Sequence, residues 1–418
     1  MCDTRNFAVN LYNGVSYLKS NYPAGEGFLP AEHVTYSQNS GPWFLNEALQ
    51  NHAHADSIDT ADKVYVHDFC FIMWWVSYMH SSMSVYGGNE HAWPLDSYPG
   101  GELVTLYHSL IQHPRWKKNN GADFVFFWPH AGISGGPAMG DYWQLACEAF
   151  GEATFVVIER MQRFQCSDYR QGKVIVAPYS SNSKYQNCPI VALPEKKLVF
   201  YKGRCTPPTE FGSEGIALRH EVVSALPIRQ DITVDCSDRH DNSFEFQSHS
   251  ALLEDMSQHR FCLVIAGDTS SSRRLTDSML AKCIPVFIGP PFHTLPLTDV
   301  VDYASFGLFL NVTSKSTFLT GQQKGQPSDY MWQLDTTRPH PVSASQSEWW
   351  VPDGDWHASA IAVEAFTDIL PTLESVQGDD LTSRQASLER FSPYFRYSSD
   401  YPAGHSATKA VIDSICSS

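Results

Sequence analysis

The sequence has little positive charge and no long apolar run, and each shortage excludes a class of protein. Lys and Arg number 29 against 45 Asp and Glu, so the formal net charge is −16. Nucleic acids and anionic lipid surfaces are bound by basic protein faces, so we expect no nucleic-acid partner. No stretch reaches the roughly 18 apolar residues of a membrane span, since the best run, Val64 to Met79, contains His67 and Asp68. We therefore expect membrane attachment only through an anchor outside this chain.

Cysteine is also scarce. Ten cysteines in 418 residues are too few for a disulfide scaffold, and no two of them have the CxxC spacing of a zinc site. We therefore expect no metal site. Two pairs, Cys166 with Cys188 and Cys205 with Cys236, could form bridges in an oxidising compartment, and buried free thiols are the open alternative.

What the sequence does contain is an alternation of short apolar runs with helical patterns. The predicted strands are Val64–Val66, Asp123–Trp128, Thr154–Ile158, Val174–Ala177, Lys197–Tyr201, Asp231–Val234, Phe261–Ile265 and Pro285–Ile288. The predicted helices are Glu102–Gln112, Asp141–Phe150, Glu214–Leu226, His249–His259, Arg273–Ala281, Ala358–Leu373 and a segment near the C-terminus. Near-continuous apolar strands are typical of parallel sheets covered on both faces, so the pattern predicts an α/β protein with two similar domains and a helical tail.

The most informative segment runs from Phe261 to Ile288. An apolar strand leads into a small polar loop, and a helix then begins at Arg273 and Arg274. Backbone N–H groups at such a helix start suit a phosphate, and two arginines in the first turn suit a bound anion better than they suit the helix dipole. Asp277 is open to two interpretations, an ordinary ion pair one turn after Arg273 or a carboxylate that bonds a ribose.

This segment resembles the nucleotide-sugar half of the exostosin-type glycosyltransferases. That family shows a strand ending Phe-Cys-Leu, a Gly-containing loop, Ser-x-Arg, an acidic residue and Cys-(Ile/Val)-Pro-Val. The matching positions here are Phe261–Leu263, Gly267, Ser272–Arg274, Asp277 and Cys283–Val286. Weaker matches follow the family's order between about residues 60 and 310: Thr60–Val66, Trp116, Gly121–Phe126, His130, Lys173–Pro178, Leu198–Arg204 and Arg219.

The resemblance implies two Rossmann-like domains facing a cleft, the B-type glycosyltransferase architecture. An acceptor-side domain would occupy residues 1–190, a nucleotide-sugar domain 191–355, and helices packing back toward the first domain 356–418, with Ala407–Ile415 as the returning helix. The donor would be a UDP-sugar, transferred with inversion and without a metal or other cofactor. The implied nucleotide-sugar residues are Gly267, Ser271, Ser272, Arg273, Arg274, Asp277, Lys202, Arg204 and Arg219. For Lys202 and Arg204 a surface ion pair is the alternative.

An inverting transfer needs a base that takes the proton of the acceptor hydroxyl. Ligands of open α/β sheets bind at the carboxyl ends of strands, and His130 lies just past the predicted strand Asp123–Trp128. His130 is therefore the predicted base, although a loop histidine that bonds a backbone carbonyl is equally compatible. Asp68 is the reserve candidate, followed by Asp141 and Glu148.

Two other functions stay open from the sequence. Gly132-Ile133-Ser134-Gly135-Gly136 matches the nucleophile elbow of serine hydrolases, although the glycines that follow are unlike its helix start. A transferase-like scaffold or carbohydrate-binding protein without activity is the second alternative, because Asp277 and Ala131 stand where the family usually has Glu and Asp. For the enzyme, the resemblance implies a polysaccharide or glycoprotein acceptor, the Golgi or another secretory lumen, and a homo- or hetero-oligomer.

Overall fold

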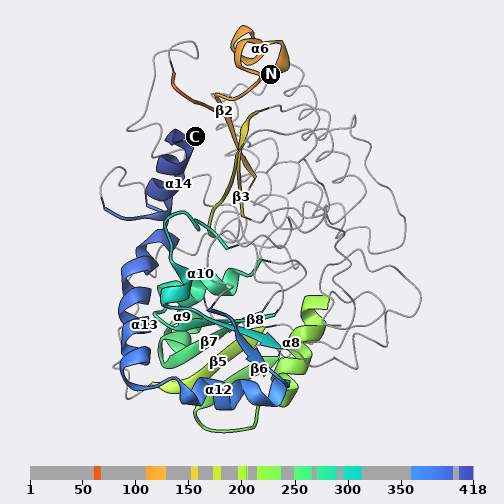
Figure 1. Ribbon diagram of the computed structural model, residues 1–418, viewed down its shortest axis with the longest axis vertical. Helices are drawn as coiled ribbons and strands as arrows, with labels where there is room; N and C mark the ends of the chain where they lie inside the picture. Colours follow the sequence, from red (N-terminus) through yellow and green to blue (C-terminus); the bar gives the residue numbers. More distant parts are fainter. Residues whose placement is uncertain are drawn as a thin grey trace, which may run out of the picture. The chain divides into compact units, whose positions relative to one another are not determined.

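The chain forms two compact units. The computed structural model describes residues 61–66, 110–128, 152–158, 173–179, 196–203, 205, 214–236, 249–265, 271–289, 295–312, 359–398 and 404–417 (Figure 1). The first unit contains residues 1–181, 397–404 and 408–418, and the second contains 182–396 and 405–407. Among the described residues, no helix combines the length and the apolarity needed to cross a membrane.

The first unit contains a parallel four-stranded sheet. Its strands are β1 (Val64–Val66), β2 (Phe124–Trp128), β3 (Thr154–Val157) and β4 (Val174–Val176), paired in that order. All four coincide with predicted strands to within one residue. All four side chains of β3 are buried, and Phe126 of β2 and Phe155 of β3 stack with ring centroids 5.2 Å apart. This is the α/β pattern expected from continuous apolar runs.

A short helix, α6 (Pro114–Asn119), leads into β2 through a tight turn. Gly121 has φ 81°, and a Cβ there would lie 2.7 Å from the ring of Trp116. A residue with a side chain would both strain the backbone and displace this tryptophan. Trp116 in turn packs against Phe124 with ring centroids 4.7 Å apart. The glycine therefore lets α6 close onto the sheet.

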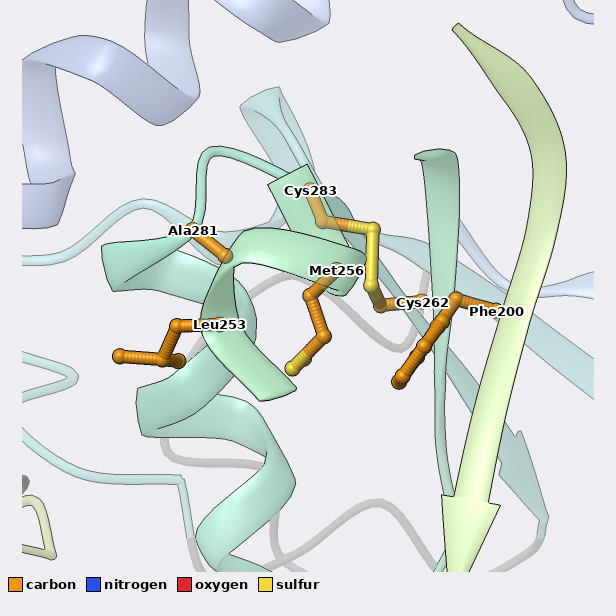
Figure 2. Close-up of a cluster of buried hydrophobic side chains, with 6 residues drawn as sticks. All are labelled: Phe200, Leu253, Met256, Cys262, Ala281 and Cys283. Carbon is orange, nitrogen blue, oxygen red and sulfur yellow. A yellow bond between two sulfur atoms is a disulfide. The ribbon is translucent and has the colours of Figure 1, made fainter. Parts of the chain in front are cut away.

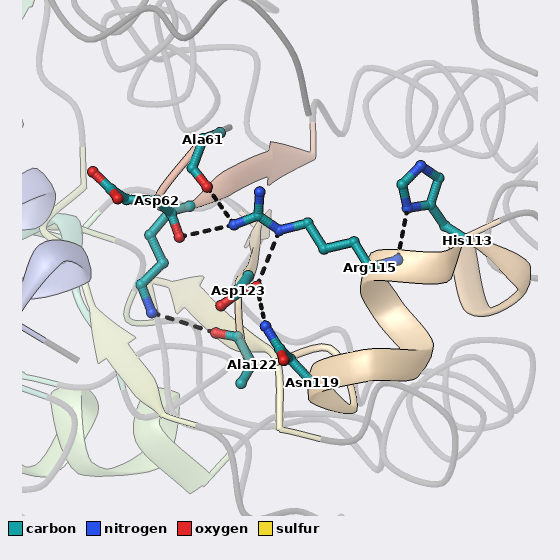
Figure 3. A network of polar contacts seen from close by, with 8 residues as sticks. Ala61, Asp62, His113, Arg115, Asn119, Ala122 and Asp123 are labelled. Atoms are coloured by element: carbon teal, nitrogen blue, oxygen red, sulfur yellow. Dashed lines mark hydrogen bonds and ion pairs between the residues drawn. The ribbon is translucent and has the colours of Figure 1, made fainter. Parts of the chain in front are cut away.

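Polar contacts join the amino-terminal ends of β1 and β2 (Figure 3). Arg115 Nε lies 3.0 Å from Asp123 Oδ2, and its Nη2 donates to the carbonyl of Asp62 at 3.2 Å. Lys63 Nζ donates to the carbonyl of Ala122 at 3.3 Å. These residues precede the strands, whereas ligands of open α/β sheets bind at the opposite edge. We therefore assign the network to stability rather than to function.

The C-terminal helix α14 (Ala407–Cys416) belongs to the first unit except for its first residue. Lys173 Nζ donates to the carbonyl of Ser414 at 2.9 Å. The buried Tyr397 donates to the carbonyl of Pro178 at 2.9 Å, and burial raises the pKa of its hydroxyl. Through these bonds the C-terminal segment is fixed to residues next to β4.

The second unit contains a parallel six-stranded sheet. Its strands are β5 (Lys197–Gly203), β6 (Ile232–Cys236), β7 (His259–Val264), β8 (Ile284–Gly289), β9 (Leu308–Val312) and β10 (Ile361–Val363). They pair in the order β10-β9-β8-β7-β5-β6. The first four were predicted, with ends that differ by up to two residues, and β9 and β10 were not.

The helices of this unit include α8 (Glu214–Ala225), α9 (His249–Ser257) and α10 (Arg273–Leu280). Helix α10 packs against α9 and on β7 and β8 (Figure 1). Figure 2 shows an apolar core cluster that includes Leu253 and Met256 of α9 and Phe200 of β5. The disulfide Cys262–Cys283 lies inside this core and links β7 to the residue before β8.

The helix predicted at Ala358–Leu373 is wrong in its first half. Residues Ile361–Val363 form β10, which pairs with the edge of β9. Helix α12 (Ile369–Ser375) begins only after a short 3-10 turn at Phe366–Asp368. β-branched Ile361 and Val363 favour a strand once an edge is available for pairing. Helix α13 (Gly378–Phe391) follows and, like α12, lies in the second unit.

The second disulfide of the described residues joins Cys205 to Cys236, with Cα atoms 5.1 Å apart. This is one of the two pairings left open by the sequence, and it closes the carboxyl ends of neighbouring strands, because Gly203 of β5 is in register with Cys236 of β6. Cys166 and Cys188, the other pair, lie outside the described residues.

A buried lysine lies at the amino-terminal edge of this sheet. Lys196 precedes β5, is 6% exposed, and donates from Nζ to the carbonyl of Lys282 at 2.9 Å. Desolvation by burial lowers its pKa from 10.5 to about 8, although the negative charge of Glu389 raises this pKa to a smaller extent. Between these two values the unfolded chain binds a proton that the folded chain lacks, so stability rises with pH in that window.

We expect this effect to disappear in the variant Lys196→Met. Relative to that variant, the free energy of unfolding of the wild type should rise by about 2 kcal/mol between about pH 7 and about pH 9.5. Urea unfolding of both proteins at the two pH values measures the difference. The exposed neighbour Lys197 provides the control variant Lys197→Met. Equal pH dependence of the wild type and Lys196→Met would contradict the prediction.

Candidate functional site

The strand order of the second unit defines where a ligand would bind. From β5 the chain passes outward to β6, and it then returns past β5 to β7 before continuing through β8 to β10. The neighbouring strands β5 and β7 are thus followed by connections that leave in opposite directions. In open α/β sheets the crevice for ligands lies at the carboxyl ends of two such strands. We call the residues at this point, between the ends of β5 and β7, the switch point.

The amino-terminal end of α10 follows β7 and carries the predicted anion-binding residues. Ser272 caps the helix, because its Oγ accepts a hydrogen bond from Arg274 N at 3.3 Å. Asp277 is buried, and its carboxylate lies 3.5 Å from Arg274 Nη1 and 3.9 Å from Arg273 Nε. Ser271, which precedes the cap, is also buried. The ion pair left open for Asp277 is therefore present, and it fixes the side chain of Arg274.

Arg274 is a desolvated cation with one buried carboxylate beside it. Desolvation lowers the pKa of its guanidinium, and the negative charge of Asp277 partly offsets this by raising the pKa. Arg219 of α8 donates from Nη2 to the carbonyl of Ile265, just after β7, at 3.2 Å. The two arginines come from different helices, and the positive charge of both lowers the pKa of the Tyr201 hydroxyl near the end of β5, against the larger, raising effect of burial. The switch point is thus positively charged and suits an anion.

Tyr201 and Gly203 are the residues of this site that the sequence analysis did not single out. Tyr201 is 2% exposed, and a Cβ at Gly203 would lie 2.8 Å from its hydroxyl. The available signal was strand alternation, which places residues 201 and 203 on one face and residues 200 and 202 on the other. A tyrosine in an apolar strand is usually interpreted as a core residue, so strand alternation alone did not identify Tyr201 as a site residue.

Lys202 lies on the other face of β5. Its Nζ is 2.8 Å from Asp255 Oδ2 of α9, the ion pair that the sequence left open as an alternative to diphosphate binding. Its Nζ also lies 5.8 Å from the ring centroid of Phe200. Lys202 is therefore directed toward α9, whereas Tyr201 is directed away from it.

Several predicted residues lie outside the described residues. Two of them, Gly267 and Arg204, belong to the predicted donor site. The others are the predicted base His130, its reserve candidates Asp68, Asp141 and Glu148, and Ser134 of the hydrolase-like motif. Strand β2 is described to Trp128, so His130 follows its carboxyl end by two residues. Within the described ranges, no group of three His, Cys, Asp or Glu side chains is arranged to hold a metal ion.

Comparison with known proteins identifies a family and two relatives. The sequence profile of the Exostosin GT47 domain matches residues 17–318. The probable arabinosyltransferase ARAD1 of Arabidopsis thaliana is 28% identical over 142 residues, which are 34% of this chain and 29% of that protein. A probable glycosyltransferase of the same plant is 25% identical over 265 residues, which are 60% of this chain and 47% of that protein.

The chain thus spans less than half the length of these curated relatives. The profile, however, covers most of the chain and includes the whole first sheet, the second sheet except β10, and helix α10. This confirms the resemblance found in the sequence. The chain belongs to the Exostosin GT47 domain family.

Proposed function

We propose that this protein is an inverting glycosyltransferase that moves a sugar from a UDP-sugar to a hydroxyl of a glycan or glycoprotein. The observation that carries the proposal is the pair Arg219 and Arg274 at the switch point, beside the amino-terminal end of α10. Guanidinium groups and a helix N-terminus together bind phosphate groups. Membership of the family supports a sugar nucleotide over other anions.

We propose two Rossmann-like domains in the B-type architecture, with the donor in the second unit and the acceptor in the first. Both sheets are parallel, and the second has the topology of a doubly wound sheet, which supports this arrangement. The acceptor hydroxyl would attack the anomeric carbon as the bond to UDP breaks, and His130 would take the hydroxyl proton. Arg274 would stabilise the negative charge that develops on the departing UDP.

The disulfides Cys205–Cys236 and Cys262–Cys283 support an oxidising compartment, since such bonds persist in secreted and lumenal proteins. We therefore place the protein in the Golgi or another part of the secretory pathway. One relative is named an arabinosyltransferase, so UDP-arabinose is the first donor to test, followed by UDP-linked xylose, galactose and glucuronate.

We expect UDP to stabilise the fold and the transfer reaction to need no metal. At one hundred times its dissociation constant, UDP should add about 2.7 kcal/mol to the free energy of unfolding. Thermal unfolding with UDP and with each UDP-sugar measures this, and transfer to a glycan acceptor is then assayed with and without EDTA. Lack of UDP binding would refute the proposal. Binding without transfer would favour the inactive scaffold, and loss of transfer in EDTA, restored by manganese, would refute metal independence.

A further inference from the structure

The hydroxyl of Tyr201 is a buried polar group with no hydrogen-bond partner among the described residues. The side chain is 2% exposed. A buried hydroxyl left without a partner destabilises a fold, whereas phenylalanine would fill the same volume without that cost. A tyrosine at such a position therefore points to a partner that arrives with a ligand.

The geometry of β5 places this hydroxyl near the switch point. Tyr201 and Gly203 share one face of the strand, and a Cβ at Gly203 would lie 2.8 Å from the hydroxyl and 3.2 Å from the adjoining ring carbon. The missing side chain leaves room for the ring to extend along the strand toward its carboxyl end. That end is the edge at which α/β sheets bind their ligands.

The charges around the hydroxyl orient it for an anion. The guanidinium groups of Arg219 and Arg274 both act on Tyr201. A cation near a hydroxyl favours the orientation in which the oxygen lone pairs face the cation and the O–H bond points away from it. An O–H group oriented in this way donates to an acceptor, and the acceptor that two arginines attract is an anion. Burial raises the pKa of the hydroxyl, so it keeps this proton at neutral pH.

We propose that Tyr201 is a diphosphate-binding residue, whose hydroxyl donates a hydrogen bond to a diphosphate oxygen of the nucleotide-sugar. The inference rests on the proposed function and adds to it a neutral donor beside the two cations. It also assigns a role to Gly203, which keeps the space that the tyrosine ring occupies.

The variant Tyr201→Phe tests the proposal by isothermal titration with UDP. Loss of a hydrogen bond to a charged group should weaken UDP binding about tenfold or more. The unfolding temperature should stay the same or rise, because the variant removes a buried hydroxyl that lacks a partner. Tyr303 is the matched control, since it is equally buried in the same unit but donates to the carbonyl of Pro296 at 2.6 Å. Tyr303→Phe should lower the unfolding temperature and leave UDP affinity unchanged.

A second variant tests the geometry. Gly203→Ala places a methyl group against the Tyr201 hydroxyl and should weaken UDP binding when it is the only change. The same substitution made in the Tyr201→Phe variant should weaken UDP binding less, because the hydroxyl is already absent. Equal UDP affinity of the wild type and Tyr201→Phe would overturn the inference and leave the proposed function standing. A wild type that binds no UDP would overturn both.

Discussion

The variant Arg274→Ala is expected to lose UDP binding by tenfold or more and sugar transfer by about a hundredfold or more. A hydrogen bond to a charged group contributes about 1.5–3 kcal/mol, which sets the effect on affinity. Removing one donor that stabilises a developing negative charge costs about 10²–10³ in rate, which sets the effect on transfer. The side chain is held for this role by Asp277, 3.5 Å away. Titration with UDP and initial rates of transfer measure the two effects.

Arg384 supplies the control for this prediction. It is another half-buried arginine of the second unit, with Nε 3.0 Å from Asp380 and Nη1 donating to the carbonyl of Gly307 at 2.7 Å. Its contacts are made away from the ends of β5 and β7, so Arg384→Ala should reduce stability and leave UDP affinity unchanged. Unchanged UDP affinity in Arg274→Ala would show that the anion-binding assignment is wrong.

The variant His130→Ala is expected to keep UDP binding and to lose at least about a hundredfold in transfer rate. Removal of a general base costs about 10²–10⁴ in rate, and the donor is proposed to bind in the other unit. His130 follows the carboxyl end of β2, where ligands of such sheets bind, and a neutral imidazole accepts a hydroxyl proton near neutral pH.

The companion variant is Asp68→Asn, which changes the residue two positions after the end of β1. Rates of transfer and UDP titrations on both variants separate the two candidates. If His130→Ala transfers sugar at the wild-type rate and Asp68→Asn does not, the aspartate is the base. Loss of UDP binding in His130→Ala would instead indicate damage to the fold.

Much of the fold was predictable because most of its strands are apolar runs, and strands such as β3 and β7 are buried along nearly their whole length. The same rule failed for β10, since Ile361 and Ala362 are exposed and only pairing with β9 makes them a strand. Strand β9 was missed although its mostly apolar run Leu-Phe-Leu-Asn-Val is longer than those of β1 and β4, which were predicted. Two residues separate it from the 3-10 turn Tyr303–Ser305.

The part of the candidate site that was predictable from the residues themselves is the charged part. Arg274 stood out because cations oppose the dipole at a helix start, and Arg219 was found only through the family resemblance. Tyr201 carries no charge and lies in an apolar strand, so the sequence gives no reason to separate it from core residues. Its proposed role depends on the register of β5 and on the missing side chain at Gly203, which only the three-dimensional structure shows.

The Cys262–Cys283 disulfide also changes what a backbone cut would do to this protein. The bridge closes a covalent ring of backbone between Cys262 in β7 and Cys283, the residue just before β8. Helix α10, with its cap Ser272 and with Arg274, lies within this ring. A protease that cuts once within the ring opens it without releasing a fragment, because both new chain ends remain attached through the two sulfur atoms. The two parts of the nicked chain therefore stay together until the disulfide is reduced, and the helix that carries Arg274 stays attached to at least one of the two strands.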